Sequence, residues 1–526
     1  MGDVTEHLLL GIDVGTSGLK VLLTDASGDV KGTATAPCQV ARPRPGWTEQ
    51  DPRDWWRACV EAVTSLRKQG AFRSGPPVGI GLTGQMHGSV FLDESDRVIR
   101  PAILWNDQRT SAECDEIERR LSIPRLIALT GNRAMTGFTA PKVVWLRANE
   151  TEHFRRLRHL LLPKDYLRLR LTGEHASDVS DASGTLLFDV RRRRWSLEMS
   201  KALEIDPDWL PPALESPEVS GRLSREAGTA LGLPPGTPVV AGAGDQAAGA
   251  VGSGSVLPGI VTASIGTSGV IFAATSQALV DPQARLHCFC HASPGLWHVM
   301  GVMLSAGGSL RWLADLVKAA APRRRNLEPW LNGLAEQAPA GAGGLLFLPY
   351  LTGERTPHAD PFARGAFVGL TSEHGLPEMA RAVMEGVAFG LRDSLQLVRE
   401  LGVVPNEARA VGGGARSRLW RQILANVLGL PLFSLAADEG AAFGAALLAG
   451  AGVGLFDSVR DACRSAVRTE ERIEPDHRAA GLYDELYREY RRLYPLLRET
   501  SHQLHDLSTR SADMGRRGSS FGRSAF

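Results

Sequence analysis

Cysteine and unbalanced charge are both scarce in this sequence. Only 6 of its 526 residues are cysteine, and their spacing fits no disulfide framework. The 59 Lys and Arg side chains are balanced by 58 Asp and Glu side chains, so no net field attracts nucleic acid or an anionic membrane. The first seven residues lack the basic and apolar regions of a signal peptide. We therefore expect a cytoplasmic protein with free thiols and with no nucleic-acid or membrane partner.

Long apolar runs and two common nucleotide motifs are missing as well. The longest plausible membrane candidate, residues 440–456, carries no charge but is mostly Ala and Gly, which favours a helix packed closely against a sheet over a membrane span. No G-x-x-x-x-G-K-[ST] sequence is present, so the chain is not a P-loop enzyme. Residues 79–84 match G-x-G-x-x-G, but a strand-like run follows where a dinucleotide fold would have a helix. Residues 287–291 read His-Cys-Phe-Cys-His. On a strand, both Cys would lie on one face and both His on the other, which favours a structural role over a zinc site.

The sequence does contain one hairpin pattern twice. In residues 8–23, two apolar runs flank a Gly-Thr-Ser-Gly turn, and Asp13 lies just before it. Such a turn can bind a phosphate through its N–H and hydroxyl groups, while the carboxylate can hold a cation. For a single copy, an ordinary surface hairpin is the alternative. Residues 260–272 repeat the pattern, which predicts two like domains whose turns face each other.

Residues 242–251 contain the sharpest single catalytic candidate, Asp245. It stands between a small-residue strand and a small-residue helix, where no large neighbour can cover it. Such a carboxylate can orient a substrate hydroxyl and take its proton late in phosphoryl transfer. The position also suits a helix N-cap, and spacing alone favours that alternative. A further glycine-rich turn at residues 412–417 either lets the backbone pass under a ligand or simply precedes a helix.

The paired hairpins resemble those of the actin-like ATPase superfamily. This resemblance implies an α/β fold of two actin-like (ribonuclease-H-like) domains with a central cleft, in which the hairpins bind the phosphates of ATP. We expect an N-terminal domain over residues 1–246, on the sugar and phosphate side, and a C-terminal domain over residues 247–500, on the nucleotide side. Residues 501–526 are rich in Ser, Arg and Gly, which predicts a disordered tail.

A longer series of motifs resembles the FGGY carbohydrate kinases and, within them, the enzymes that phosphorylate D-xylulose. The motifs are residues 11–20, 84–88, 102–107, 162–167, 176–184, 244–250, 264–269, 347–357 and 412–417. The resemblance implies phosphoryl transfer from ATP to D-xylulose, giving D-xylulose 5-phosphate and ADP, with Mg²⁺ as cofactor. The alternative within the family is a kinase of ribulose, gluconate or glycerol. A homodimer is compatible with the sequence.

The resemblance also implies roles for single residues. Asp245 matches the catalytic base, and Asp13 matches the acidic group near Mg²⁺ and the γ-phosphate. The residues that match sugar contacts, or lie beside them, are Gln85, Met86, His87, Trp105, Asn106, Asp107 and Gln246. Those that match phosphate or adenosine contacts are Thr16, Ser17, Lys20, Thr267, Ser268, Gly307, Arg311, Trp312, Gly413, Gly414 and Ser417.

Three of these positions bear on the choice of substrate and on the class of protein. Gln246 stands where xylulose-specific members commonly have Asn, and the longer side chain shifts the pocket. Met86-His87, in place of the Arg-Glu pair of glycerol kinases, favours a ketopentose. A lone His is more often a core residue, but the flanking glycines favour exposure of His87 to a pocket. Asp245-Gln246 beside Gln85-Met86-His87 argues against a filament-forming or peptide-binding actin relative, because such proteins need no polar sugar pocket. The presence of both Asp13 and Asp245 argues against an inactive sugar-binding module.

Overall fold

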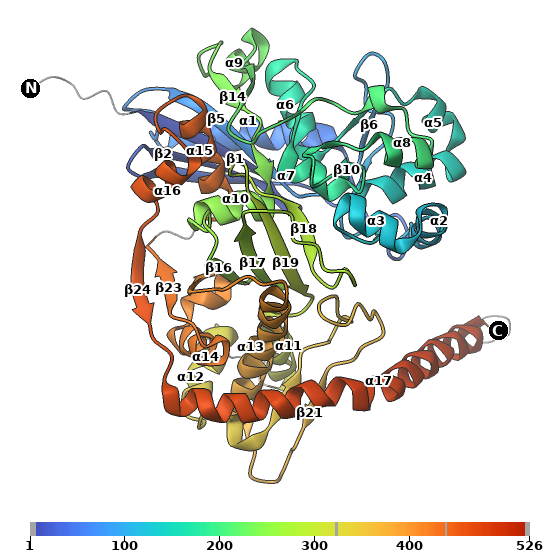
Figure 1. The fold of residues 1–526 in the computed structure, drawn as a ribbon, viewed down its shortest axis with the longest axis vertical. Helices are drawn as coiled ribbons and strands as arrows, with labels where there is room; N and C mark the ends of the chain where they lie inside the picture. The colour runs from blue at the N-terminus through green and yellow to red at the C-terminus, as the bar shows by residue number, and fades with distance from the viewer. Residues whose placement is uncertain (1–6, 321–324, 437–438, 521–526) are drawn as a thin grey trace, which may run out of the picture. The chain divides into compact units, whose positions relative to one another are not determined.

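The structure, a computed structural model, describes residues 7–320, 325–436 and 439–520, which form two compact units (Figure 1). The first unit comprises the chain up to Val261 together with Phe272–Val299 and Leu435–Glu470. The second comprises Thr262–Ile271, Met300–Ser434 and the chain from Glu471 onward. Three stretches beyond residue 246, where the sequence boundary lies, therefore belong to the first unit: residues 247–261, Phe272–Val299 and Leu435–Glu470.

The first unit contains short strands and helices around one large sheet. Its strands are β1 (Leu8–Val14), β2 (Gly18–Asp25), β3 (Val30–Pro37), β4 (Glu49–Gln50), β5 (Pro77–Gly84), β6 (Val90–Leu92), β7 (Ala102–Ile103), β8 (His159–Leu161), β9 (Ser177–Asp178), β10 (Phe188–Asp189), β11 (Arg194–Trp195), β12 (Ala213–Leu214), β13 (Val219–Arg222), β14 (Pro238–Val240), β15 (Ala243–Gly244) and β18 (His287–Cys290). Its helices are α1 (Pro52–Lys68), α2 (Ser111–Leu121), α3 (Ile123–Thr130), α4 (Thr139–Asn149), α5 (Thr151–Arg156), α6 (Pro163–Thr172), α7 (Val179–Ala182), α8 (Leu197–Leu203), α9 (Arg225–Leu231), α10 (Asp245–Gly252), α15 (Ala441–Gly452) and α16 (Val459–Ala466). The sheet has the order β13-β14-β5-β1-β2-β3, and β15 also pairs with β5.

Alternation along β1 divides the core of this unit between two layers. Leu8, Leu10 and Ile12 pack in one cluster with α1, whereas Leu9 packs in the other with α15. Because side chains alternate across a strand, Asp13 lies on the same face of the sheet as Leu9. The first catalytic candidate therefore faces the layer that contains α15.

Helix α15 confirms the close packing that its Ala- and Gly-rich sequence predicts. A Cβ on Gly11 of β1 or on Gly81 of β5 would collide with the α15 backbone carbonyls, at 1.9 and 1.8 Å. A Cβ on Gly444 of α15 would likewise lie 1.8 Å from the carbonyl oxygen of Ala248 in α10. Only glycine permits such approaches, and they fix α10 close to the carboxyl ends of β1 and β5. Among the helices of the described ranges, none has the length and hydropathy needed to cross a bilayer.

The second unit has its own strands and longer helices. Its strands, several of which extend across the unit boundary, are β16 (Ile260–Ile265), β17 (Gly269–Thr275), β19 (Trp297–Met303), β20 (Leu346–Leu348), β21 (Ala366–Val368), β22 (Glu407–Val411), β23 (Leu432–Leu435) and β24 (Thr469–Ile473). Its helices are α11 (Gly307–Ala320), α12 (Leu327–Ala335), α13 (Leu376–Glu400), α14 (Arg418–Leu428) and α17 (His477–Ser520). The large sheet has the order β18-β19-β17-β16-β22-β23-β24, and β16 and β17 form the second Gly-Thr-Ser-Gly hairpin.

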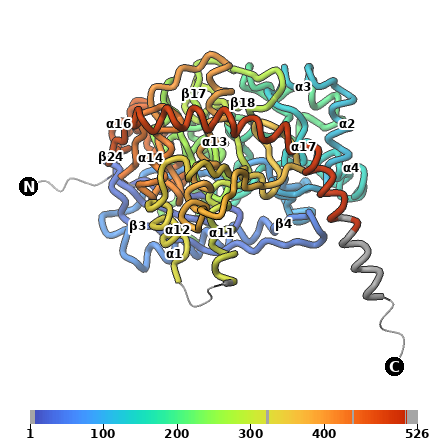
Figure 2. The backbone as a smooth tube through the Cα atoms, turned by 90° about the horizontal axis from the view of Figure 1, so that it is seen from below, coloured from blue at the N-terminus to red at the C-terminus, as the bar shows by residue number. Residues whose placement is uncertain are grey.

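Helix α17 differs from the expected disordered tail. It passes over α13 (Figure 2) and continues through residues 501–520, while residues 521–526 lie outside the described ranges. Tyr483 and Tyr487 donate hydrogen bonds to Glu385 and Asp393 of α13, at 2.7 and 2.6 Å. Beyond residue 500, Nε2 of His502 lies 2.8 Å from a carboxylate oxygen of Asp360. A prediction of disorder from composition does not take such specific contacts into account.

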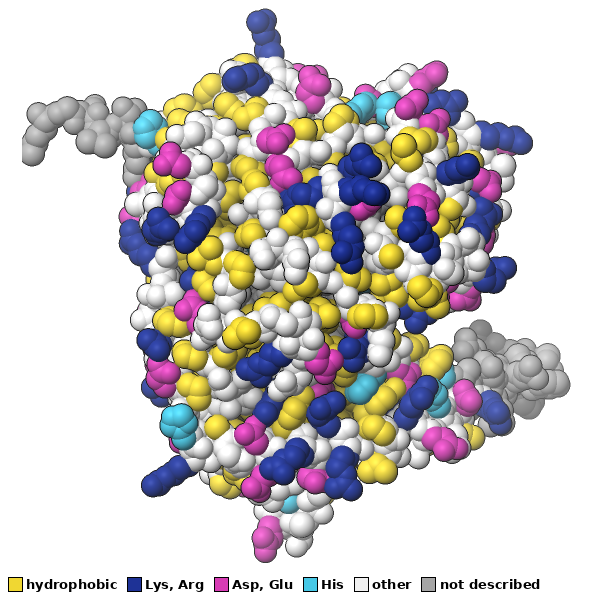
Figure 3. All heavy atoms as spheres, viewed as in Figure 1, with side chains coloured by type: hydrophobic (Ala, Val, Ile, Leu, Met, Phe, Trp, Pro, Cys, Tyr) yellow, Lys and Arg dark blue, Asp and Glu magenta, His cyan; other side chains and the backbone are white. Residues whose placement is uncertain are grey.

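The cysteines are free, as expected, and charges of both signs are mixed on the surface. All six cysteines are buried and free. In β18, His287 bonds Asn132 at 2.8 Å, which fits the structural role expected of the His-Cys-Phe-Cys-His sequence. Lys and Arg side chains lie among Asp and Glu side chains over the face that Figure 3 shows.

Candidate active site

Asp13 and Asp245 lie at the carboxyl ends of two strands, β1 and β15, that both pair in parallel with β5. In β1, β5 and β15, residues Asp13, Thr83 and Ala243 are aligned, and the next row ends in Gly84 and Gly244. Asp245 follows Gly244 directly. Open α/β sheets bind ligands beyond the carboxyl ends of their strands, so both carboxylates occupy a position suited to a reaction centre.

Asp245 does not cap helix α10. Gly244 occupies the N-cap position, and Asp245 is the first helical residue, so the capping alternative for Asp245 is wrong. The next residue, Gln246, lies beside the Asp245 carboxyl, and its polar groups oppose the rise in the pKa of that carboxyl.

The protein raises the pKa of both carboxyls, although each residue is only half-buried. Packed protein atoms, and secondarily the charge of Asp13, raise the pKa of Asp245 to about 7. Burial raises the pKa of Asp13 to about 6, and the nearby Lys20 opposes that shift. A carboxyl with a pKa near 7 is matched to the transfer of a proton at neutral pH.

Met86 and His87 lie immediately beside Asp245. Met86 fills the space left by two glycines, since a Cβ on Gly244 or on Gly184 would come within 2.8 Å of its side chain. His87 has a φ of +68°, an unusual backbone conformation for a residue with a side chain. Its Nδ1 lies 2.7 Å from the carbonyl oxygen of Gly184, and its ring is half-buried. The expected sugar pair is therefore anchored next to the candidate base.

Thr16 joins the first phosphate turn to the expected sugar residues. Its hydroxyl donates to Oε1 of Gln85 at 2.9 Å and accepts from the indole N–H of Trp105 at 3.0 Å. The amide of Gln85 in turn donates to Gln50 at 2.9 Å, and Gln50 donates to the carbonyl oxygen of Thr16 at 2.7 Å. Trp105 is 41% exposed. The network leaves the Trp105 ring accessible to a ligand while its edge is fixed.

The other predicted residues of the first unit have contrasting environments. Asp107 is fully buried and accepts hydrogen bonds from Arg109 and from the backbone N–H of Thr48, so its carboxyl is occupied within the protein. Asn106 is half-buried, and its Oδ1 has no hydrogen-bond partner among the described residues. Ser17 is exposed, and Lys20 pairs with Glu439 at 2.6 Å.

In the second unit, the Gly266–Ser268 turn is attached to the start of α11. The carbonyl oxygen of Thr267 accepts from the N–H groups of Ala306 and Gly308, at 2.8 and 3.1 Å, and Gly307 donates to Gly266 at 2.8 Å. A Cβ on Gly307 would lie 2.6 Å from the carbonyl oxygen of Gly266. Thr267 itself is exposed and Ser268 is half-buried, so both hydroxyls can be reached from solvent.

The residues expected near adenosine also lie in the second unit. A Cβ on Gly413 would meet no atom of the described residues within 4 Å, whereas one on Gly414 would collide with Ile265 at 2.4 Å. Ser417 caps α14 and bonds Asn332. Two more predicted residues lie on α11: Arg311 pairs with Glu328 at 2.9 Å, and Trp312 stacks on Phe347 at 6.1 Å.

Comparison with known proteins decides the family. Models of the N- and C-terminal domains of the FGGY family of carbohydrate kinases match residues 8–252 and 261–453. The chain is 44% identical to the xylulose kinase of Escherichia coli (strain K12), over 93% of this chain and 99% of that protein. It is 37% identical to the xylulose kinase of Bacillus subtilis (strain 168), over 92% and 96%. The solved xylulose kinase of Rhodospirillum rubrum is 34% identical, with a TM-score of 0.87 over 94% of this chain and 100% of that one.

The chain belongs to the FGGY family of carbohydrate kinases. This FGGY chain is therefore a sugar kinase, and the expected α/β fold with two actin-like domains is confirmed.

Sequence reasoning missed a buried ionic cluster that lies behind Gly244 and Asp245 in this FGGY kinase. The ammonium group of Lys164 lies 2.6 Å from Asp165, 2.8 Å from Asp178 and 3.3 Å from Asp181, and all four side chains are fully buried. Asp178 accepts from the hydroxyl of Ser180, which in turn accepts from the N–H of Gly244 at 3.1 Å. The cluster thus supports the residue before Asp245. All four of its residues fall in the motifs 162–167 and 176–184 that resemble the family, but nothing in the sequence indicated that they pair with one another.

Proposed function

We propose that this chain transfers the γ-phosphoryl group of ATP to the terminal hydroxyl of D-xylulose, giving D-xylulose 5-phosphate and ADP. The observation that carries the proposal is the position of Asp245 at a strand end, with a pKa raised to about 7, beside the anchored pair Met86-His87. The xylulose kinases that match nearly the whole chain support this choice of substrate. Free buried thiols and the use of ATP fit a cytoplasmic location.

The carboxylate of Asp245 would orient the sugar hydroxyl and accept its proton as the oxygen–phosphorus bond forms and the bond to ADP breaks. The polar groups of Gln246 beside it favour the ionised form of the carboxyl, because they oppose the rise in its pKa. His87 would contact the sugar hydroxyls through its imidazole and Trp105 would contact the sugar through its ring, because each is partly exposed.

Asp13 fits the role of Mg²⁺ ligand. Its carboxyl is half-buried and lies close enough to Asp245 for its charge to raise the pKa of that residue, so the local field favours a cation. When bound, Mg²⁺ supplies neutralisation of phosphate charge. The backbone N–H groups of each turn and the hydroxyls of Ser17, Thr267 and Ser268 would bind phosphate oxygens, and Gly413 offers open backbone for adenosine.

A coupled assay of ADP release tests the proposal across D-xylulose, ribulose, gluconate and glycerol. We expect kcat/KM to be highest for D-xylulose by at least about tenfold, which corresponds to about 1.4 kcal/mol of differential transition-state binding. A higher value for another substrate would move the assignment to that kinase of the family. Light scattering with ATP and Mg²⁺ should show no filaments, and growth of scattering would support the filament-forming alternative instead.

A further inference from the structure

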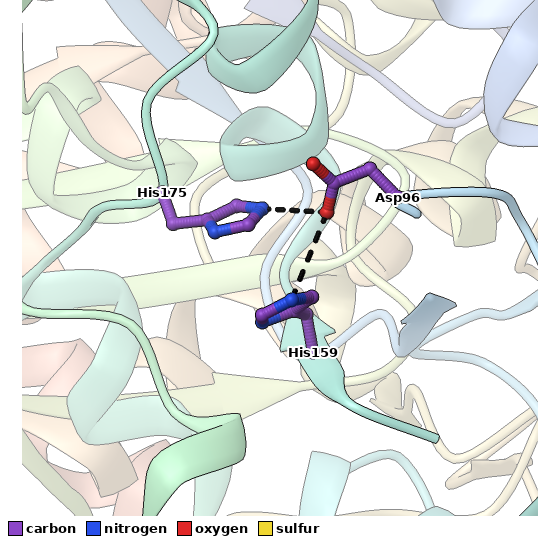
Figure 4. Close-up of side chains that lie close together, drawn as sticks. All are labelled: Asp96, His159 and His175. Carbon is purple, nitrogen blue, oxygen red and sulfur yellow. Dashed lines mark hydrogen bonds and ion pairs between the residues drawn. The ribbon is translucent and has the colours of Figure 1, made fainter. Parts of the chain in front are cut away.

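Two histidines and one aspartate converge on the surface of the first unit, away from the residues assigned to phosphoryl transfer. Nε2 of His175 lies 2.8 Å from Oδ1 of Asp96, and Nε2 of His159 lies 3.9 Å from the same oxygen (Figure 4). One ligand atom from each residue lies within 4.8 Å of the other two. The side chains of the histidines are 27–29% exposed and that of Asp96 is 41% exposed, so an ion could enter from solvent.

The three side chains come from separate segments. Asp96 lies in the turn after β6, His159 is the first residue of β8, and His175 follows α6. The two imidazole rings pack with centroids 4.2 Å apart and planes tilted by 34°. A carboxylate needs only one imidazole to pair with, whereas two imidazoles that share one carboxylate oxygen form the donor set of a transition-metal site.

We propose that Asp96, His159 and His175 bind a divalent transition-metal ion of the zinc class, distinct from the Mg²⁺ used with ATP. Imidazole nitrogen suits Zn²⁺, whereas Mg²⁺ prefers an all-oxygen shell. Tetrahedral ligands about 2.0–2.1 Å from Zn²⁺ lie about 3.3 Å from one another, and the two observed separations of 2.8 and 3.9 Å bracket that value. Water completes the coordination on the exposed side.

The ion would link three segments of the first unit. Strand β8 pairs with β6, and the turn that contains Asp96 follows β6 directly. His175 precedes β9, whose Asp178 bonds the Ser180 hydroxyl behind Gly244. We therefore assign the ion a stabilising role for the segments around β6, β8 and β9, which lie behind Gly244 and Asp245. This role is separate from proton or phosphoryl transfer.

Equilibrium dialysis of the full-length, metal-stripped protein against micromolar Zn²⁺ tests the site. We expect one high-affinity ion per chain, and a loss of affinity of at least about tenfold in His159→Ala and in His175→Ala. His153→Ala is the matched control, because His153 pairs with Glu150 at 2.7 Å without a second histidine, and it should bind normally. Binding of Co²⁺ should also give a visible absorption band that both site variants lose.

Circular dichroism confirms that each variant is folded. The proposal is overturned if the wild-type protein binds no stoichiometric Zn²⁺, or if both site variants bind it as the wild type does. Neither result alters the assignment of the sugar kinase reaction, which the ADP-release assay tests by itself.

Discussion

The two Gly-Thr-Ser-Gly hairpins share a sequence pattern but differ in what surrounds each turn. The position before the turn is half-buried in both, yet it is Asp13 in the first hairpin and Ser264 in the second. The first turn is held by side chains, since Gln50 and Gln85 bond Thr16. The second is held by backbone N–H groups at the start of α11. We infer that one copy provides a carboxylate and contact with the sugar, while the other provides only phosphate binding.

The largest effect is expected from Asp245, which follows β15 of the first unit and belongs to neither hairpin. Asp245→Asn keeps the shape of the side chain but removes the proton acceptor, so kcat should fall by about 10²–10⁴-fold. Steady-state kinetics measures the loss, and calorimetric binding of ATP should stay near the wild-type value. Near-normal turnover in this variant would exclude Asp245 as the base.

Exchanging the acid for the hydroxyl of the other hairpin sharpens the comparison directly. Asp13→Ser gives the first turn the sequence character of the second and removes the candidate Mg²⁺ ligand, so kcat/KM should fall by about 10²-fold and more Mg²⁺ should be needed. Ser264→Ala is the matched control and should change kcat/KM by less than about tenfold, as expected for one lost neutral hydrogen bond. Equal losses in both variants would mean that the hairpins play the same part.

The pH dependence tests whether the two carboxyls of the first unit interact. A base must be unprotonated, so kcat/KM should fall about tenfold per unit as the pH drops below the Asp245 pKa of about 7. The fall should steepen below about 6, where Asp13 also takes up a proton. Because the charge of Asp13 raises the pKa of Asp245, Asp13→Asn should move the acidic limb of its residual activity to lower pH. An unmoved limb would show that the two groups titrate independently.

The sequence predicts the turns better than it predicts what supports them. The hairpins and the small-residue helix α15 are local patterns, and periodicity with glycine spacing is enough to find them. Glu439, which pairs with Lys20, and Gln50, which supports Thr16, are distant in the chain from their partners. No local pattern marks them, because the tertiary fold alone creates these contacts.

The contrast between local patterns and tertiary contacts also explains why Asp107 and the N-cap of α10 differ from what the sequence predicts. The resemblance places Asp107 at or beside the sugar contacts, but in the structure the aspartate forms an internal ion pair with the buried side chain of Arg109. At Asp245, spacing favours an N-cap, and the φ and ψ angles of Gly244 give that role to the glycine instead. Both outcomes depend on backbone positions that a single sequence does not encode locally.

A smaller effect is expected at the adenosine turn of the second unit. Gly413→Ala adds a methyl group that has no neighbour within 4 Å in the described part of the chain, so the melting temperature should hardly change. If adenosine lies over this backbone, the methyl group obstructs it, and KM for ATP should rise by about tenfold, or about 1.4 kcal/mol. Gly333→Ala on α12 is equally uncrowded and should leave KM for ATP unchanged. A normal KM in Gly413→Ala would place the nucleotide elsewhere.

The smallest expected effect comes from the link between the first turn and the sugar residues. Trp105→Phe keeps the ring but removes the N–H that donates to Thr16 at 3.0 Å, so the hydroxyl of Thr16 loses one of its two side-chain partners. The loss of one partly exposed hydrogen bond is worth about 0.5–1.5 kcal/mol, and kcat/KM for D-xylulose should fall by about two- to tenfold. Because Thr16 also belongs to the phosphate turn, KM for ATP should rise in parallel. A change in the sugar KM alone would show that Trp105 acts only as a sugar contact and that the network does not couple the two substrates.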